Sequence, residues 1–150
     1  MKLDVGSGIS KRAGYVTIDR DPSVKPDVLA DIEEKIPIED GIVSEIRAYA
    51  ILEHLDARNK VKVMAEFWRI LEPDGILDIK VPIAGTAPSF QDPTHISFWN
   101  SASFWYFLKG NAFYEAFKKR YSKYPVPGFT LVEQDTVKGW SYHIKLRKVL

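Results

Sequence analysis

The chain has 150 residues, a length that favours one domain over residues 1–150. Hydrophobic residues make up 45% and charged residues 27% of the chain, as in ordinary globular proteins. The chain has no cysteine, which excludes disulfide bonds, thiolate zinc sites and a cysteine nucleophile. No apolar run approaches the roughly 20 residues of a membrane span, and the first residues do not form a signal peptide. We therefore expect no membrane contact and a cytoplasmic location.

The formal net charge of +1 hides an uneven distribution. Residues 1–100 hold 12 basic and 17 acidic residues, whereas residues 101–150 hold 9 basic and 3 acidic ones. One interpretation is that carboxylates gather where a ligand needs hydrogen-bond acceptors. Another is that the basic end meets an anionic substrate.

Apolar runs that alternate with helical or loop segments predict a parallel sheet with crossover connections. The first five strands are expected at 2–5, 15–18, 27–30, 45–49 and 75–82. Two further strands, at 129–135 and 142–150, are expected to form an antiparallel pair at one sheet edge.

A helix is predicted over 57–71, between the fourth and fifth strands. Apolar residues recur at helical spacing on one face, at Val61, Met64, Ala65, Trp68 and Leu71, and Val63, Phe67 and Ile70 widen that face. Pro73 cannot continue a helix interior, so the helix should end before it.

The opening segment "KLDVGSGISKRAGYVTIDRD" places Asp4, Gly6 and Gly8 around the end of one strand and Asp19 at the end of the next. In an open parallel sheet, ligands bind beyond the carboxyl ends of the strands. Glycine there lets the backbone turn tightly and approach a ligand. A carboxylate at the next strand end can accept hydrogen bonds from ribose hydroxyls. The segment therefore indicates a nucleoside site.

Two nucleoside cofactors compete for this site. A dinucleotide site has a third glycine, but that position is Lys11, and its acidic residue follows about 20 residues later rather than the 11 that separate Gly8 from Asp19. S-adenosylmethionine (SAM) carries an amino group, a sulfonium, a ribose diol and an adenine amine. Asp4, Asp19 and Asp31 would supply acceptors for these groups, so the segment favours SAM over NAD.

Five segments, taken in order, resemble the class I SAM-dependent methyltransferases, most closely the small branch labelled methyltransferase type 11. They are "LDVGSG", "GYVTIDRD", "DVLADIEEKIPIEDGIVSEIRAYAILEHL", "EFWRILEPDGILDIKVP" and "DPTHISFW", within about residues 2–107. The resemblance implies a Rossmann-like, doubly wound α/β fold. Its seven-stranded sheet would be mostly parallel, with an antiparallel last strand.

The same resemblance assigns residues to the cofactor. They are Asp4, Gly6, Gly8, Asp19, Asp31, Ile32, Ala48, Tyr49 and His54. The first three would border the methionine part, the fourth would bind the ribose, and Asp31 with Ile32 would face the adenine. Ala48 and Tyr49 would line the methyl-donor cavity. Asp31 has the alternative role of capping the next turn, and His54 that of packing in the interior.

Two departures from the family accompany this resemblance. The N-terminal helical cap that usually precedes the first strand is missing, so we expect an open acceptor pocket. The helix after the first glycine turn is reduced to "ISKRA", so one edge of the cofactor should be less covered.

The segment "QDPTHISFW" (91–99) is the candidate for chemistry outside the cofactor. Asp92 and His95 lie three residues apart, and a carboxylate can orient a histidine that acts as general base. The alternative is that Asp92 caps the turn and His95 bonds a backbone carbonyl. The histidines at 54, 95 and 143 show no tight ligand spacing, so no metal site is predicted.

These patterns favour an enzyme that transfers a methyl group from SAM to an O or N nucleophile of a small molecule. A nucleic-acid acceptor is less favoured, because a pI of 7.9 falls short of a basic footprint despite the segment "FKKRYSKY" (117–124). The alternative is a SAM-binding module, or a subunit of an assembly, without turnover of its own. The sequence does not indicate an oligomeric state.

Overall fold

The computed structural model describes residues 1–120 and 126–150. The end of the basic segment 117–124 therefore lies outside the described residues. The strands are β1 (Lys2–Val5), β2 (Val16–Asp19), β3 (Val28–Leu29), β4 (Val43–Tyr49), β5 (Leu71–Pro82), β6 (Phe129–Val137) and β7 (Ser141–Lys148). The α-helices are α1 (Lys60–Ile70), α2 (Ala87–Phe90), α3 (Ser101–Trp105) and α4 (Ala112–Arg120), with short 3-10 turns at η1 (Pro22–Val24), η2 (Leu52–His54) and η3 (Ala57–Asn59).

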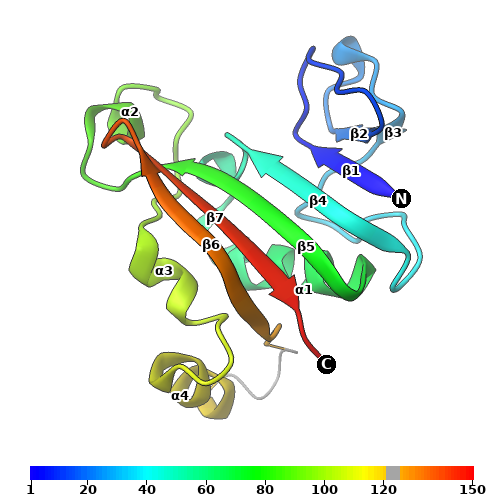
Figure 1. Cartoon of the computed structure of the whole chain (residues 1–150). Coiled ribbons are helices and arrows are strands. Elements are labelled where there is room, and N and C mark those ends of the chain that lie inside the picture. Colours follow the sequence, from blue (N-terminus) through cyan, green and yellow to red (C-terminus); the bar gives the residue numbers. More distant parts are fainter. Residues whose placement is uncertain (121–125) are drawn as a thin grey trace.

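The strands form one sheet in the order β3-β2-β1-β4-β5-β7-β6 (Figure 1). Neighbours among the first five strands pair in parallel, and β7 runs antiparallel to both β5 and β6. The strand order reverses between β1 and β4, which is the topological switch point where ligands bind in such sheets. The structure therefore confirms the Rossmann-like sheet and its antiparallel last strand.

Helix α1 packs its apolar stripe on the sheet. Val63, Met64, Phe67 and Ile70 are fully buried, and their spacing puts them on one side of a helix. The helix ends where Leu71 adopts an extended backbone (ψ 136°). At Asp74 the chain takes a positive φ of 64° inside the "EPDG" segment, and β5 continues toward the ligand end.

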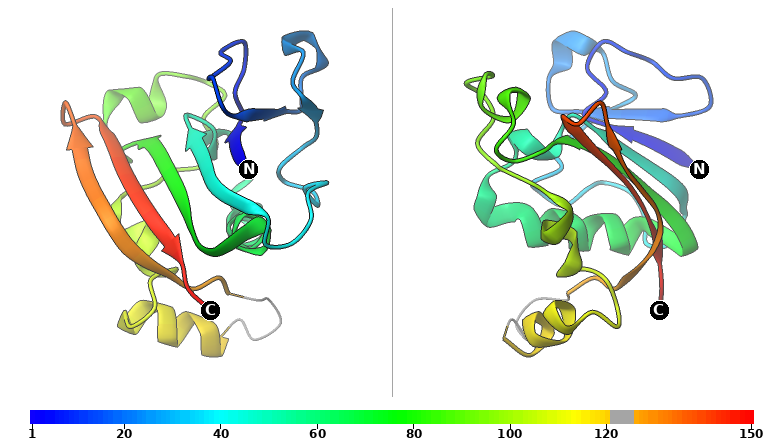
Figure 2. Two further views of the ribbon diagram at one scale, coloured as in Figure 1. Left: turned by 45° about the vertical axis from the view of Figure 1, so that its right-hand side comes forward. Right: turned by 60° about the vertical axis from the view of Figure 1, so that its left-hand side comes forward.

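One face of the sheet meets the helices and the other is polar. Figure 2 shows α1 and α3 on the same side of the sheet. On that side β7 buries Tyr142, Ile144 and Leu146, whereas the alternating residues, which include His143 and Lys145, are less buried. This alternation is typical of a sheet with one solvated face.

The β6–β7 hairpin closes through Lys138 and Gly139, which both have positive φ (53° and 71°). The Trp140 amide donates to the Val137 carbonyl at 3.2 Å. Two successive positive φ values match the twist of paired strands, and the predicted antiparallel pair is confirmed. Among the helices of the described residues, none combines the length and the apolar character that a bilayer crossing needs.

Candidate functional site

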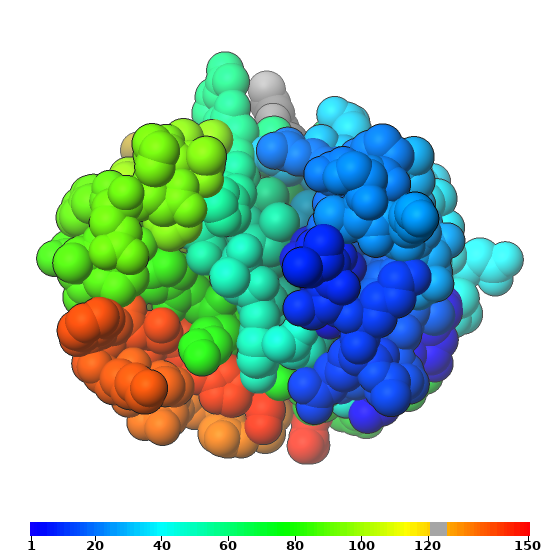
Figure 3. All heavy atoms as spheres, turned by 90° about the horizontal axis from the view of Figure 1, so that it is seen from above, coloured from blue at the N-terminus to red at the C-terminus, as the bar shows by residue number. Residues whose placement is uncertain are grey.

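A cavity of about 270 Å³ opens at the carboxyl ends of β1, β2 and β4. Figure 3 looks onto this end of the molecule, where the dark blue and blue N-terminal residues face the segment that follows β4. The lining residues are Gly6, Ile18, Asp19, Arg20, Ala30, Asp31, Ile32, Glu33, Ile51, His54, Leu55 and Thr94. Five predicted cofactor residues thus come together here, and they are Gly6, Asp19, Asp31, Ile32 and His54.

The glycine turn after β1 is tied directly to the end of β2. The Gly8 amide donates to Oδ2 of Asp19 at 2.9 Å, and the Gly6 amide donates to the Ile18 carbonyl at 2.8 Å. Both glycines have positive φ, 63° and 54°. A Cβ on Gly6 would lie 2.5 Å from the Ile51 side chain, whereas a Cβ on Gly8 would meet nothing within 4 Å. Gly6 is therefore required by packing, and Gly8 only by backbone conformation.

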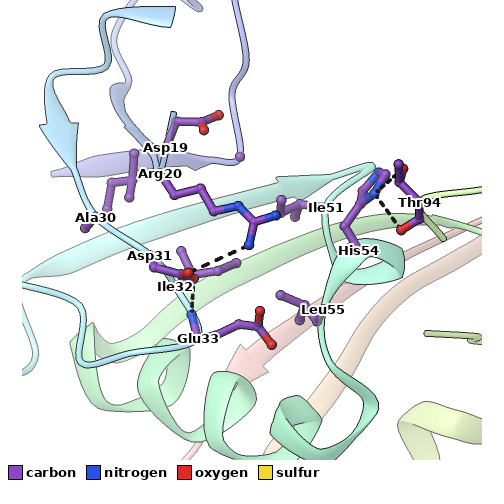
Figure 4. A pocket seen from close by; sticks show the side chains of 12 residues that line it. Asp19, Arg20, Ala30, Asp31, Ile32, Glu33, Ile51, His54, Leu55 and Thr94 are labelled. Atoms are coloured by element: carbon purple, nitrogen blue, oxygen red, sulfur yellow. Dashed lines mark hydrogen bonds and ion pairs between the residues drawn. The ribbon is translucent and has the colours of Figure 1, made fainter. Parts of the chain in front are cut away.

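Three carboxylates, those of Asp19, Asp31 and Glu33, and the Arg20 guanidinium contribute charged groups to the pocket (Figure 4). Asp19 also accepts the Asp21 amide on Oδ1 at 3.0 Å, so each of its oxygens holds one backbone amide and keeps a lone pair for a ligand. Asp31 accepts the Glu33 amide at 2.9 Å and faces Nη1 of Arg20 at 3.8 Å. The capping role expected for Asp31 and its place in the pocket therefore occur together.

Four predicted cofactor residues do not line this cavity. Gly8 holds Asp19 from outside it, and Ala48 is buried in the core. Asp4 is 2% exposed and accepts Nη1 of Arg47 on both oxygens at 2.9 Å. Tyr49 lies against Arg47, whose guanidinium is 3.9 Å from the ring centroid. The cofactor contacts of these four residues stay predictions.

Tyr49 belongs to a small cluster on the polar sheet face. Its hydroxyl lies 3.2 Å from both oxygens of Asp78, and Asp78 lies 2.6 Å from Nε2 of His143. Burial, followed by the charge and hydrogen bond of Asp78, raises the pKa of Tyr49. Tyr49 is therefore held as a hydrogen-bond donor rather than as a proton acceptor.

The predicted catalytic residues, Asp92 and His95, lie in the turn that packs against His54. Asp92 accepts the Thr94 amide at 2.8 Å and the Thr94 hydroxyl at 2.7 Å, and these bonds lower the pKa of Asp92. Nδ1 of His95 lies 3.3 Å from the Ser89 carbonyl, and Nε2 lies 3.7 Å from Asp92. Asp92 thus caps the turn, and it is too far from His95 for a hydrogen bond. Neither residue lines the pocket, and the general-base role stays a prediction.

The turn brings His95 against two residues of η2. The His54 and His95 rings meet edge to face, with centroids 4.8 Å apart. Ligand atoms of Glu53, His54 and His95 all lie within 4.8 Å of one another. The amides of Ile96 and Ser97 donate to the Glu53 carbonyl at 3.0 Å, which fixes the turn on η2. Sequence spacing did not reveal this proximity, because 41 residues separate the two histidines.

Seven lining residues were not predicted, and they are Ile18, Arg20, Ala30, Glu33, Ile51, Leu55 and Thr94. Arg20 and Ala30 adjoin predicted residues in the chain, so strand ends alone could have indicated them. Thr94 reaches the pocket through a long loop, and its hydroxyl lies 3.1 Å from Nδ1 of His54.

No protein-family model matches the chain, and no curated protein sequence matches it. Solved structures do. PH0226 protein from Pyrococcus horikoshii OT3 is similar over 99% of this chain and 82% of its own, with 12% identity and a TM-score of 0.69. A SAM-dependent methyltransferase from Aquifex aeolicus is similar over 99% and 81%, with 18% identity and a TM-score of 0.65.

N-methyltransferase NodS from Bradyrhizobium japonicum WM9 is similar over 99% of this chain and 85% of its own, with 15% identity and a TM-score of 0.66. Identities this low show the fold alone. Together with the strand order, they show that the chain has the class I SAM-dependent methyltransferase fold.

Proposed function

We propose that the protein transfers a methyl group from SAM to an oxygen or nitrogen nucleophile of a small molecule. The observation that carries this proposal is the pocket at the topological switch point. There, a glycine turn is hydrogen-bonded to Asp19. That arrangement offers a backbone surface and a carboxylate to one ligand at the place where this fold binds nucleosides.

The hydrogen-bond acceptors and the apolar wall of the pocket fit SAM. Asp19 would accept the ribose hydroxyls, and Asp31 would accept the adenine amine beside the apolar wall of Ile32 and Leu55. Gly6 lines the pocket with its backbone, and the absence of a side chain leaves room for Ile51, which forms the adjoining wall. Since these groups include no phosphate-binding helix N-terminus, the set suits an adenosyl ligand better than a dinucleotide.

Catalysis in this proposal depends on positioning. SAM supplies a sulfonium-activated methyl group, which the acceptor takes as S-adenosylhomocysteine is released. The chain's own task is then to align the acceptor with the methyl group and to exclude water. A proton acceptor is needed only where the nucleophile carries a proton at neutral pH, and His95 with Asp92 is the predicted base for that case.

Calorimetry tests the proposal first with SAM and with S-adenosylhomocysteine, using NAD as the competing ligand. Transfer from SAM labelled in the methyl group to pooled small metabolites then tests turnover. Binding of adenosyl ligands with transfer supports the proposal. Binding without transfer to metabolites or RNA would favour the alternative of a SAM-binding module, and preferential NAD binding would contradict both.

A further inference from the structure

The strongest feature that the proposed function leaves unused is the group formed by Glu53, His54 and His95. A carboxylate oxygen and one nitrogen of each imidazole lie within 4.8 Å of one another. In a tetrahedral site with bonds of about 2.0–2.2 Å, ligand atoms stand roughly 3.3–3.6 Å apart. Small side-chain rotations would close the group around one ion.

Glu53 gives an independent reason to place a cation here. Glu53 is only 3% exposed, and its Oε2 has no hydrogen-bond partner among residues 1–120 and 126–150. A buried carboxylate oxygen without a partner is costly, and most such atoms in proteins have one.

Both histidines are oriented as metal-binding histidines usually are. Nδ1 of His54 lies 3.3 Å from the Thr94 carbonyl, and Nδ1 of His95 lies 3.3 Å from the Ser89 carbonyl. A carbonyl only accepts, so these contacts favour the proton on Nδ1 and the lone pair on Nε2. The Thr94 hydroxyl, 3.1 Å from Nδ1 of His54, donates to Asp92 and can accept the same N–H. Metal-binding histidines commonly donate their second ring N–H to a carbonyl in this way.

We propose that Glu53, His54 and His95 bind one divalent transition metal ion of the Zn²⁺ type. Two imidazoles and a carboxylate form a ligand set found in catalytic zinc sites, and three protein ligands leave a further position open. Mg²⁺ and Ca²⁺ prefer oxygen ligands, so two nitrogens disfavour them. The expectation from sequence spacing that the three histidines form no metal site is thereby replaced for His54 and His95.

The proposed site adjoins the cofactor pocket, because His54 belongs to both. An acceptor oxygen or nitrogen that takes the open position would lose its proton more easily. This consequence rests on the proposed function, whereas metal binding itself does not. With the metal bound, the His95 lone pair is no longer available to act as general base.

The test titrates EDTA-treated protein with ZnCl₂ by calorimetry and with CoCl₂ by visible absorption. One ion per chain is expected. Loss of a residue that only hydrogen-bonds a metal ligand already lowers metal affinity about 10- to 100-fold. Loss of a ligand itself, in Glu53→Gln, His54→Ala or His95→Ala, should therefore weaken metal binding by at least ~100-fold. His143→Gln is the matched control, since it alters the remaining histidine of the chain and should leave the affinity within about twofold.

Absence of saturable binding to the wild-type protein would overturn the proposal, and so would equal binding by His95→Ala. If Glu53→Gln does not fold, the partly exposed His54→Ala carries the test. Zn²⁺ should then raise the melting temperature of the wild type and not of that variant. Titration of the wild type with S-adenosylhomocysteine separates the two proposals, because a wild type that binds the adenosyl ligand but no metal refutes the metal site alone.

Discussion

Arg47 holds both carboxylate oxygens of Asp4 at 2.9 Å across the β1–β4 pair. Asp4 is 2% exposed and the Arg47 side chain 23% exposed. The first acidic residue of the glycine turn is therefore engaged by the sheet before any ligand arrives. Removing one partner of a buried ion pair leaves the other charge uncompensated, which is costly, so this pair ties β1 to β4.

We expect Asp4→Asn to destabilise the protein by about 2–3 kcal/mol, below the usual range for fully buried pairs because Arg47 is partly exposed. Urea unfolding measures this. Lys2→Met is the matched control, because it breaks the more exposed Lys2–Glu45 pair and leaves the Tyr15–Glu45 hydrogen bond in place. It should cost about 1 kcal/mol or less. S-adenosylhomocysteine affinity should stay within about threefold. A large affinity loss in folded Asp4→Asn would instead establish the direct contact that the resemblance implies.

Asp19→Ala should weaken SAM binding by roughly 10- to 150-fold, equivalent to about 1.5–3 kcal/mol, because two ribose hydroxyls would lose their acceptor. Calorimetry with SAM measures this loss. Asp21→Ala is the matched control, since it removes a neighbouring exposed carboxylate that caps η1. Equal affinities of the Asp19 variant and the wild type would place the ribose elsewhere.

Alanine substitutions at the two glycines of the turn should have different effects. Gly6→Ala should lower stability strongly, since its Cβ would overlap Ile51 at 2.5 Å. Gly8→Ala should lower the free energy of unfolding by only about 1–2 kcal/mol, because alanine is strained at a positive φ. It should bind SAM poorly if the ligand lies against the turn. Thermal melting and calorimetry distinguish the two. Normal SAM affinity in Gly8→Ala would make the second glycine structural only.

Arg20 should oppose the binding of SAM. Its guanidinium lies in the pocket, 3.8 Å from Asp31, and SAM carries a sulfonium that the same positive charge repels. Arg20→Ala should therefore bind SAM about two- to fivefold more tightly, a small effect because the side chain is exposed and screened. Arg20→Lys keeps the charge and should bind like the wild type. Weaker binding by Arg20→Ala would mean that the guanidinium contacts the ligand.

The positions of the strands and of the main helix could be predicted because the signals are local. Strand β1 was expected at 2–5 and lies at Lys2–Val5, and the helix expected over 57–71 lies at Lys60–Ile70. The polar sheet face was missed, although "HIKLRK" in β7 alternates apolar and charged residues as a half-solvated strand does. The alternation of β7, and not only its apolar content, indicates this polar face.

The site was predictable where it follows strand ends and not where it depends on long-range packing. Asp19 is the last residue of β2 and Asp31 follows β3, so the pairing of these two strands places them together. His95 lies against His54 because its loop is hydrogen-bonded to the Glu53 carbonyl and, through Thr94, to His54 itself. These contacts have no local signal in the sequence. For the same reason the ion pair of Asp4 with Arg47, 43 residues away, was not foreseen.

His95 is the residue at which the remaining hypotheses give different results. If it acts as general base, His95→Ala should slow methyl transfer roughly 10²- to 10⁴-fold, with SAM affinity unchanged and no effect of EDTA on the wild type. If it binds the proposed metal, EDTA should slow the wild type to the level of the variant, and Zn²⁺ should restore only the wild type. If it merely anchors the turn through Ser89, the variant should lose about 1 kcal/mol of stability and keep its rate per folded molecule. Turnover with and without EDTA, measured beside thermal melting of the same two proteins, decides among the three roles.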